Sequence, residues 1–213
     1  MAPKAKFTRA QLQGAALALV DEQGLAALSM RTLAGALGTG PMTLYNYVKD
    51  RDELDALVVE AVLAEVKPAQ PRGDWQADVR AIVEATWRTV RRHPNVIPLV
   101  LTRRTLHETT LHWAEGLLEA LALSGRRDTE LLVAFRTVSG FVMGLAQAQL
   151  SGPTAEHPDV ARAQALPADR YPRLIEIARA ARGLGPDREF RAGLDIVMAG
   201  LAAGSAAGAI RRS

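Results

Sequence analysis

The segment 29–49, SMRTLAGALGTGPMTLYNYVK, restricts the possible folds of this chain more than any other stretch. Ser29 suits the N-cap of a helix, and Gly38 suits its end. Pro41 suits the first position of a following helix, because its fixed φ is helical and its missing N–H would be unpaired there. The pattern predicts helix, tight turn and short helix, a unit with which small proteins insert a helix into the major groove of DNA.

The charge of the chain points to the same region. Residues 1–51 hold six basic and three acidic residues, while the whole chain holds 26 and 23. The formal excess of +3 therefore belongs to the first quarter of the sequence, and the remainder is neutral. This distribution predicts that the basic N-terminal part is a head that contacts DNA, and that the neutral remainder is a body with a different function.

Composition favours a helical protein with a sizeable core. Of 213 residues 48% are hydrophobic but only 5% are aromatic, and there is no cysteine for disulfides or thiolate metal sites. The longest uncharged run, 196–210, is shorter than the roughly 20 apolar residues that a spanning helix needs. We interpret it as a buried helix and, with no apolar stretch of signal-peptide type near the start, expect a cytoplasmic protein without a membrane partner.

Helical periodicity continues along the chain, and no alternating strand pattern occurs. Helices are expected over about 8–23 and 51–66, and the run KPAQPRG at 67–73 then predicts a domain boundary. Beyond it, helices are expected over about 75–92, 96–102, 106–123, 129–150, 171–182 and 187–211, with a loop at 151–168. The predicted class is all-α: a three-helix helix-turn-helix domain with its connecting helix, 1–66, and a larger helical effector-binding and dimerisation domain, 67–213.

Several of these residues resemble the tetracycline-repressor (TetR) family of bacterial transcription regulators. The likeness rests on Leu33-Ala34, Leu37-Gly38, Thr43-Leu44-Tyr45, Tyr47-Val48-Lys49 and Asp50-Arg51. Shorter matches follow at Trp75, Arg92-His93-Pro94, Phe141-Val142-Met143-Gly144, Phe190-Arg191-Ala192-Gly193-Leu194-Asp195 and Gly200-Leu201. The resemblance implies an all-helical homodimer whose two heads bind a palindromic operator in double-stranded DNA. It also implies a small-molecule effector that binds the body and releases the DNA, with repression as the family default.

The residues expected to contact DNA lie on and around the predicted recognition helix. Asn46 can bond bidentately to adenine, Arg31 can reach guanine or a phosphate, and Pro41 and Met42 offer apolar contact to a thymine methyl group. Groups suited to phosphate oxygens complete the set: Thr39, Thr43, Tyr45, Tyr47, Lys49 and Arg51. Met30 stands where close relatives of the tetracycline repressor have a polar residue, so the same operator is not implied.

Alternatives remain for parts of this interface. Tyr45 could pack on the first helix as core, and Lys49 could be only a solvated charge. The whole chain could also be an architectural or nonspecific DNA-binding protein without an effector, which would rely on phosphate contacts alone. The modest charge excess and the presence of Asn46 and Arg31 favour sequence-specific binding.

Glycines recur every fourth residue in two predicted helices of the body. They are Gly140 and Gly144 in one and Gly200, Gly204 and Gly208 in the other. Small residues on one face allow helices to approach closely. We predict that these helices form a four-helix dimer interface, with close packing inside one chain as the alternative.

The effector pocket is expected among the helices of 75–150, with a mostly apolar lining and few polar groups. The candidates are Trp87, Val100, Arg104, His107, Trp113, Phe135, Ser139, Phe141, Met143 and Gln147. Plain core packing is the alternative for Phe135, Phe141 and Met143, and Ser139 could simply bond a carbonyl one turn back.

No catalytic, cofactor or metal site is expected. His107 and His112 are five residues apart, a spacing that does not place both on one helix face as metal ligands. Ser139-Gly140 lacks the nucleophile-elbow pattern, and no phosphate-binding glycine loop follows a predicted strand. The sequence therefore predicts a binding protein and not an enzyme.

Overall fold

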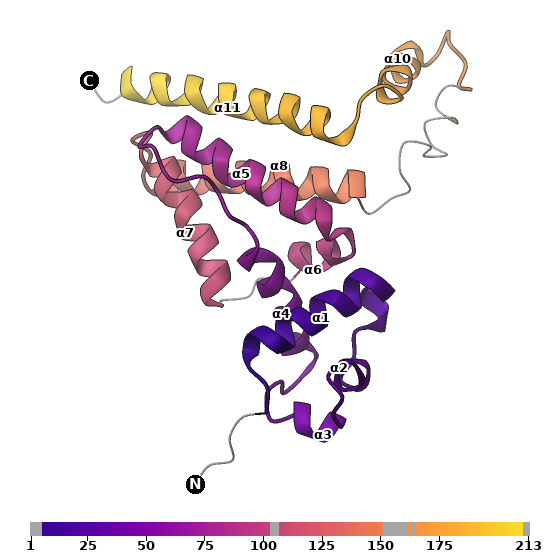
Figure 1. Cartoon of the computed structure of the whole chain (residues 1–213). Coiled ribbons are helices and arrows are strands. Elements are labelled where there is room, and N and C mark those ends of the chain that lie inside the picture. The colour runs from indigo at the N-terminus through magenta and orange to yellow at the C-terminus, as the bar shows by residue number, and fades with distance from the viewer. Residues whose placement is uncertain (1–5, 103–106, 151–161, 163–164, 211–213) are drawn as a thin grey trace. The chain divides into compact units, whose positions relative to one another are not determined.

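The structure is a computed structural model that describes residues 6–102, 107–150, 162 and 165–210 (Figure 1). Its helices are α1 (Arg9–Gln23), α2 (Met30–Ala36), α3 (Pro41–Leu44), α4 (Arg51–Ala64), α5 (Trp75–Arg92), α6 (Ile97–Thr102), α7 (Glu108–Ala122), α8 (Asp128–Leu150), α10 (Pro172–Ala181) and α11 (Pro186–Ile210). A 3₁₀ turn, η1 (Leu25–Ala27), lies between α1 and α2, and a second, η2 (Pro94–Val96), lies between α5 and α6. No strand occurs among the described residues, and the all-α class is confirmed.

The predicted helix starts are confirmed by their hydrogen bonds. The Thr8 side chain accepts the N–H of Gln11, that of Ser29 accepts the N–H of Thr32, and that of Asp50 accepts the N–H of Glu53. Each satisfies a backbone donor that the first helical turn leaves without a partner. Side-chain chemistry at these three positions therefore sets the beginnings of α1, α2 and α4.

The recognition helix begins at Pro41, as the sequence predicts, and is very short. It ends at Leu44, and the next three residues form a turn. The N–H groups of Asn46 and Tyr47 donate to carbonyls three residues back, those of Thr43 and Leu44, which tightens the backbone after the first helical turn. The element is one turn of α-helix continued by a tighter turn.

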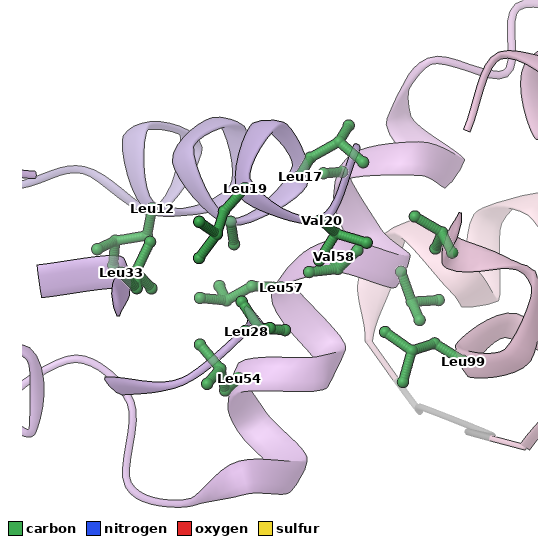
Figure 2. Packing of buried hydrophobic residues seen from close by; sticks show 14 of the residues in the cluster. Leu12, Leu17, Leu19, Val20, Leu28, Leu33, Leu54, Leu57, Val58 and Leu99 are labelled. Atoms are coloured by element: carbon green, nitrogen blue, oxygen red, sulfur yellow. The ribbon is translucent and has the colours of Figure 1, made fainter. Parts of the chain in front are cut away.

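Helix α4 is the centre about which the head, α1 to α4, is built (Figure 2). Its residues from Leu54 to Leu63 are all buried, which is typical of a helix surrounded by other helices. Leu12, Leu19 and Val20 of α1 pack with Leu28, Leu33, Leu54 and Leu57 in one cluster that excludes water. This core fixes α2 and α3 relative to α1 and α4, and therefore orients the surface that they carry.

The chain divides into two compact units, Met1–Leu123 and Ser124–Ser213. In the first, α4 packs against α1, α5, α6 and α7, so the connecting helix belongs to the same core as the helices that follow it. This division lies far from the domain boundary predicted at 66/67 from the run KPAQPRG, and that boundary stays a prediction.

In the second unit, α8 packs against α11. Phe141 and Phe190 stack with ring centroids 6.0 Å apart, and Leu194 and Met198 of α11 are buried. One stretch of α8, Asp128–Ala148, is long and apolar enough to cross a membrane by length and composition alone. Only about a fifth of it, 22%, is buried among the described residues.

The interpretation of 196–210 as a buried helix is wrong for 196–204, the part whose side chains are described. Met198 is buried, but Ile196 is 75% exposed, and Ala199, Gly200 and Ala203 on the same helix are also exposed. Residues 196–204 therefore have one face turned inward and one face exposed, which is the pattern of an amphipathic packing helix.

Candidate DNA-binding surface and effector cavity

The turn between α2 and α3 is held by backbone geometry that the sequence specifies locally. Gly38 has a φ of 61°, a left-handed conformation that favours glycine. The N–H of Thr39 then donates to the carbonyl of Ala34 at 2.9 Å, and Pro41 occupies the first position of α3. The chain reverses within four residues, and α3 begins with its first turn open to solvent.

The predicted DNA-contacting residues form an exposed layer over a buried one. Leu44 and Val48 have 0% and 1% of their surface exposed, so they anchor the recognition element to the core of the head. Met42 is 78% exposed, and Arg31, Pro41, Asn46 and Lys49 are exposed as well. The short element thus holds polar and apolar side chains above a rigid base, which is the arrangement that reading base edges requires.

The two tyrosines of this element differ in their surroundings. Tyr45 is 50% exposed, which argues against its packing as core on α1. Tyr47 is half-buried against the head core and makes an edge-to-face contact with Phe7. Its hydroxyl accepts the backbone N–H groups of Lys6 and Phe7 at 2.7 and 3.2 Å.

Lys6 is a basic residue at this surface that no sequence motif indicates. Its ammonium donates to the hydroxyl of Thr39 at 3.3 Å, which places it beside a predicted phosphate contact. The available signal was its contribution to the basic N-terminal charge, but no helical pattern fixes the position of a residue that precedes α1.

Arg51 is occupied inside the head. Its guanidinium donates to the buried carboxylate of Asp55 at 2.7 Å and to the carbonyl of Leu28, just before α2. These bonds brace α4 against the start of the recognition unit. The side chain is still 48% exposed, and its predicted phosphate contact stays a prediction beside this structural role.

A buried carboxylate, Glu60, joins three parts of the first unit. Arg9 of α1 donates to its two oxygens at 2.9 and 2.8 Å, and Gln13 donates at 2.8 Å. His107, the N-cap residue of α7, lies with Nδ1 3.0 Å from the same group. The hydrogen bond to Glu60 raises the pKa of Arg9 against the opposing effect of burial.

A second polar junction links α1 to the end of α5. The two ring nitrogens of His93 lie 2.8 Å from Asp21 and 3.2 Å from Glu65. The amide of Asn95 donates to the carbonyls of Val20 and Asp21, which satisfies the C-terminal end of α1. Each imidazole nitrogen of His93 therefore faces one carboxylate, and the ring joins α1 to the C-terminal end of α4.

A cavity of about 290 Å³ lies between α4, α5 and α7. Its lining is mostly apolar, with the Thr109 hydroxyl and the His112 imidazole as polar groups, and consists of Leu63, Ala64, Val66, Pro68, Ile82, Thr109, His112, Trp113 and Gly116. The indole N–H of Trp113 donates to the Thr86 hydroxyl at 3.0 Å, and that hydroxyl donates to the carbonyl of Ile82. These bonds fix the ring orientation, and the cavity suits a small, largely apolar ligand.

Of the predicted pocket residues, Trp113 lines this cavity. Trp87 is 2% exposed in α5, Val100 packs against the head core, and His107 contacts Glu60. Arg104 lies outside the described residues. Half of the missed lining residues, Leu63, Ala64, Val66 and Pro68, come from the end of α4 and the segment after it, where an apolar helix followed by proline was the available signal.

The remaining pocket candidates lie on α8, in the second unit. The Ser139 hydroxyl donates to the carbonyl of Phe135 at 2.7 Å, the local bond that the sequence left open as an alternative. Phe141 stacks on Phe190, Met143 is half-buried, and Gln147 is exposed. Effector contact by these residues stays a prediction.

A more polar recess of about 810 Å³ lies beside the end of α4 and along α5. Its charged side chains are Glu65, Lys67, Arg88 and Arg92, and Arg92 pairs with Glu65 at 3.0 Å. The recess is open and mixed in charge, so it fits a hydrated surface better than an effector site.

Among the described residues, four of the five glycines predicted at the dimer interface do not mediate close packing. A Cβ atom added at Gly140, Gly144 or Gly200 would meet nothing within 4 Å, and at Gly204 it would approach only the Arg126 guanidinium, at 3.9 Å. Gly208 lies in α11, in the part whose side chains are not described. The close approach instead occurs at Gly193, where a Cβ would lie 2.6 Å from the ring of Phe141.

Comparison with known proteins agrees with this arrangement. Residues 67–204 match the family model described as "Tetracyclin repressor-like, C-terminal domain". The HTH-type transcriptional repressor DrrR1 of Streptomyces coeruleorubidus is 32% identical over 93% of this chain and 78% of its own length. Apo ActR from Streptomyces coelicolor is 32% identical, with a TM-score of 0.84 over 96% of this chain and 99% of that one.

ActR, described as a TetR family protein, has also been solved in complex with actinorhodin, with 32% identity to this chain and a TM-score of 0.81 over 94% of this chain and 99% of that one. The match to the family model covers most of the sequence, and the relatives align along nearly its whole length with the same helical architecture. This chain belongs to the TetR family of transcriptional regulators.

Proposed function

We propose that this protein is a ligand-responsive repressor that binds a palindromic operator as a homodimer and leaves it when a small-molecule effector binds. The observation that carries the proposal is the exposed layer of Arg31, Met42 and Asn46 above the buried Leu44 and Val48. Residues 1–66 would contact DNA and residues 67–213 would bind effector and form the dimer, in the cytoplasm and without catalysis.

The effector site is assigned to the cavity lined by Trp113. Its apolar walls and oriented indole favour a ligand with a flat apolar body, with Thr109 and His112 as polar anchors. ActR has been solved with actinorhodin and with (S)-DNPA, so these two compounds are the first to try. A ligand that enters between α4 and α7 acts on the helix that carries the head core, which gives binding a direct mechanical link to the recognition unit.

Selection of binding sites from a random duplex pool tests the proposal. We expect enrichment of a two-fold palindrome whose half-site centres lie about one helical turn apart. The selected duplex is then used to measure release by (S)-DNPA and actinorhodin. A pool without enrichment, with binding that vanishes as salt rises, would instead support a nonspecific DNA-binding protein.

Replacing Asn46 by alanine is expected to relax preference at one base position of each half-site. The exposed amide can make a bidentate contact with adenine, and its loss costs about 1–3 kcal/mol of discrimination against other bases. The measurement is binding of the variant to single-base substitutions of the selected duplex. Lys49→Ala serves as the control, since a phosphate contact should weaken binding to every duplex alike; an unchanged base profile for Asn46→Ala would reject Asn46 as a base reader.

Replacing Gly200 by leucine is expected to weaken the dimer. Gly200 faces open space in the single chain, so leucine meets no obstacle there, whereas it would overpack a closely apposed partner helix. We expect the dimer dissociation constant, measured by analytical ultracentrifugation, to rise at least about tenfold, because overpacking typically costs about 1–3 kcal/mol.

Gly14→Leu is the matched control, because Gly14 is an exposed glycine of α1 whose added Cβ also meets open space. It should leave the dimer unchanged. Equal association of both variants and the unmodified protein would contradict a dimer interface at Gly200.

A further inference from the structure

The Tyr47 hydroxyl fastens the segment before α1 to the recognition element. It accepts the N–H groups of two successive residues, Lys6 at 2.7 Å and Phe7 at 3.2 Å. The Phe7 and Tyr47 rings also pack edge to face, with centroids 6.1 Å apart. Residues 40 or more positions apart in the sequence are therefore held in one arrangement by polar and aromatic contacts together.

This fastening determines where the Lys6 ammonium lies. It donates to the Thr39 hydroxyl at 3.3 Å and lies 5.3 Å from the centroid of the Phe7 ring. Thr39 is on the turn that leads into α3, so the charge lies at the edge of the exposed recognition layer. An ammonium has three donors, and a neutral hydroxyl leaves its charge uncompensated.

We propose that Lys6 contacts a DNA phosphate and that Tyr47 is the residue that positions it. The inference rests on the proposed DNA-binding function and extends it to a residue outside the helix-turn-helix. A phosphate oxygen beside Thr39 would accept from the Lys6 ammonium and the Thr39 hydroxyl together, in a charge-assisted bond. Without the Tyr47 hydroxyl, the two backbone N–H groups lose their acceptor and the segment loses its fixed position.

The test measures the affinity of four variants for the selected duplex and for an unrelated duplex, between about 50 and 200 mM salt. They are Lys6→Ala, Lys6→Arg, Tyr47→Phe and the double variant Lys6→Ala/Tyr47→Phe. Lys67→Ala is the matched control, because Lys67 is an exposed lysine in the segment after α4, away from the recognition element. Thermal unfolding of each variant establishes that it is folded before binding is compared.

For Lys6→Ala we expect the affinity for both duplexes to fall about threefold to tenfold. The slope of log affinity against log salt should become shallower by about 0.9 for each subunit that loses its Lys6 contact. Lys6→Arg should keep the slope of the unmodified protein. Tyr47→Phe alone should weaken binding by a similar factor. In the Lys6→Ala background the same substitution should change the affinity less than about twofold, because Tyr47 then has no ammonium to position.

Two results would overturn the inference. Lys6→Ala with the affinity and salt slope of Lys67→Ala would exclude Lys6 as a phosphate contact. Independent, multiplying effects of Lys6→Ala and Tyr47→Phe would show that Tyr47 acts on DNA by itself and not through Lys6. Failure of the unmodified protein to prefer the selected duplex would reject the proposed operator binding instead, since the Lys6 comparison can be made on any duplex.

Discussion

Arg9→Ala is expected to lower the free energy of unfolding by about 2–3 kcal/mol. The Glu60 side chain is 3% exposed, and Arg9 donates two hydrogen bonds to it. Removing one partner of a buried pair typically costs about 3–5 kcal/mol, because the other charge loses its main compensation. Gln13 still donates a hydrogen bond to Glu60, which lowers the expected cost here. The Arg9 side chain is 48% exposed, so solvent screening lowers the expected value. Urea denaturation followed by circular dichroism measures the change.

The source of this loss is tested by neutralising Glu60 in the same background. Arg9→Ala/Glu60→Gln should recover most of the lost stability, because glutamine keeps a hydrogen-bonding group without a buried charge. Arg173→Ala is the control: its pair with Glu176 is exposed on both sides and should contribute less than about 0.5 kcal/mol. Simple additivity of the Arg9 and Glu60 substitutions would show that the two residues do not act as a pair.

Trp87→Ala is expected to cost about 3–5 kcal/mol of stability, the largest effect of any substitution considered. The indole is 2% exposed in α5, so its removal leaves a large cavity that the surrounding helices fill only in part. Such a loss is a large fraction of the stability of an ordinary domain. Thermal and urea unfolding measure it, with Trp87→Phe expected to lose much less.

Trp113→Ala provides the contrast. Trp113 is half-buried and lines the cavity between α4, α5 and α7. Compared with Trp87→Ala, Trp113→Ala should therefore reduce the stability less and the affinity for effector more. If a folded Trp87→Ala protein lost effector binding while keeping normal stability, Trp87 would be a ligand contact and its assignment to the core would be wrong.

The helical elements were largely predictable because their signals are local. Thr8, Ser29 and Asp50 begin helices through hydrogen bonds within their own first turns, and Pro41 begins α3 through its own backbone geometry. Periodic apolar residues then indicated the inward faces, as for Leu44 and Val48. These features require no knowledge of distant parts of the chain.

The candidate site was predictable only in part. The exposure of Met42 in α3 follows from helical periodicity. The hydrogen bonds of Arg51 to Asp55 and Leu28 depend instead on how α4 meets the segment before α2. Most cavity-lining residues were missed, because a cavity is the space left between three helices and has no pattern in any one of them. His107 was placed in a pocket by its chemical type, whereas the structure places its ring against Glu60.

By itself, the sequence determined the all-helical class, the capped helices, the glycine turn before α3 and the concentration of positive charge near the start. Each of these depends on neighbouring residues or on composition. Only the tertiary structure brought Lys6 to Tyr47, Arg9 to Glu60 and Gly193 to Phe141. Such contacts join residues tens of positions apart, and packing geometry, which local propensity does not specify, decides which of them form.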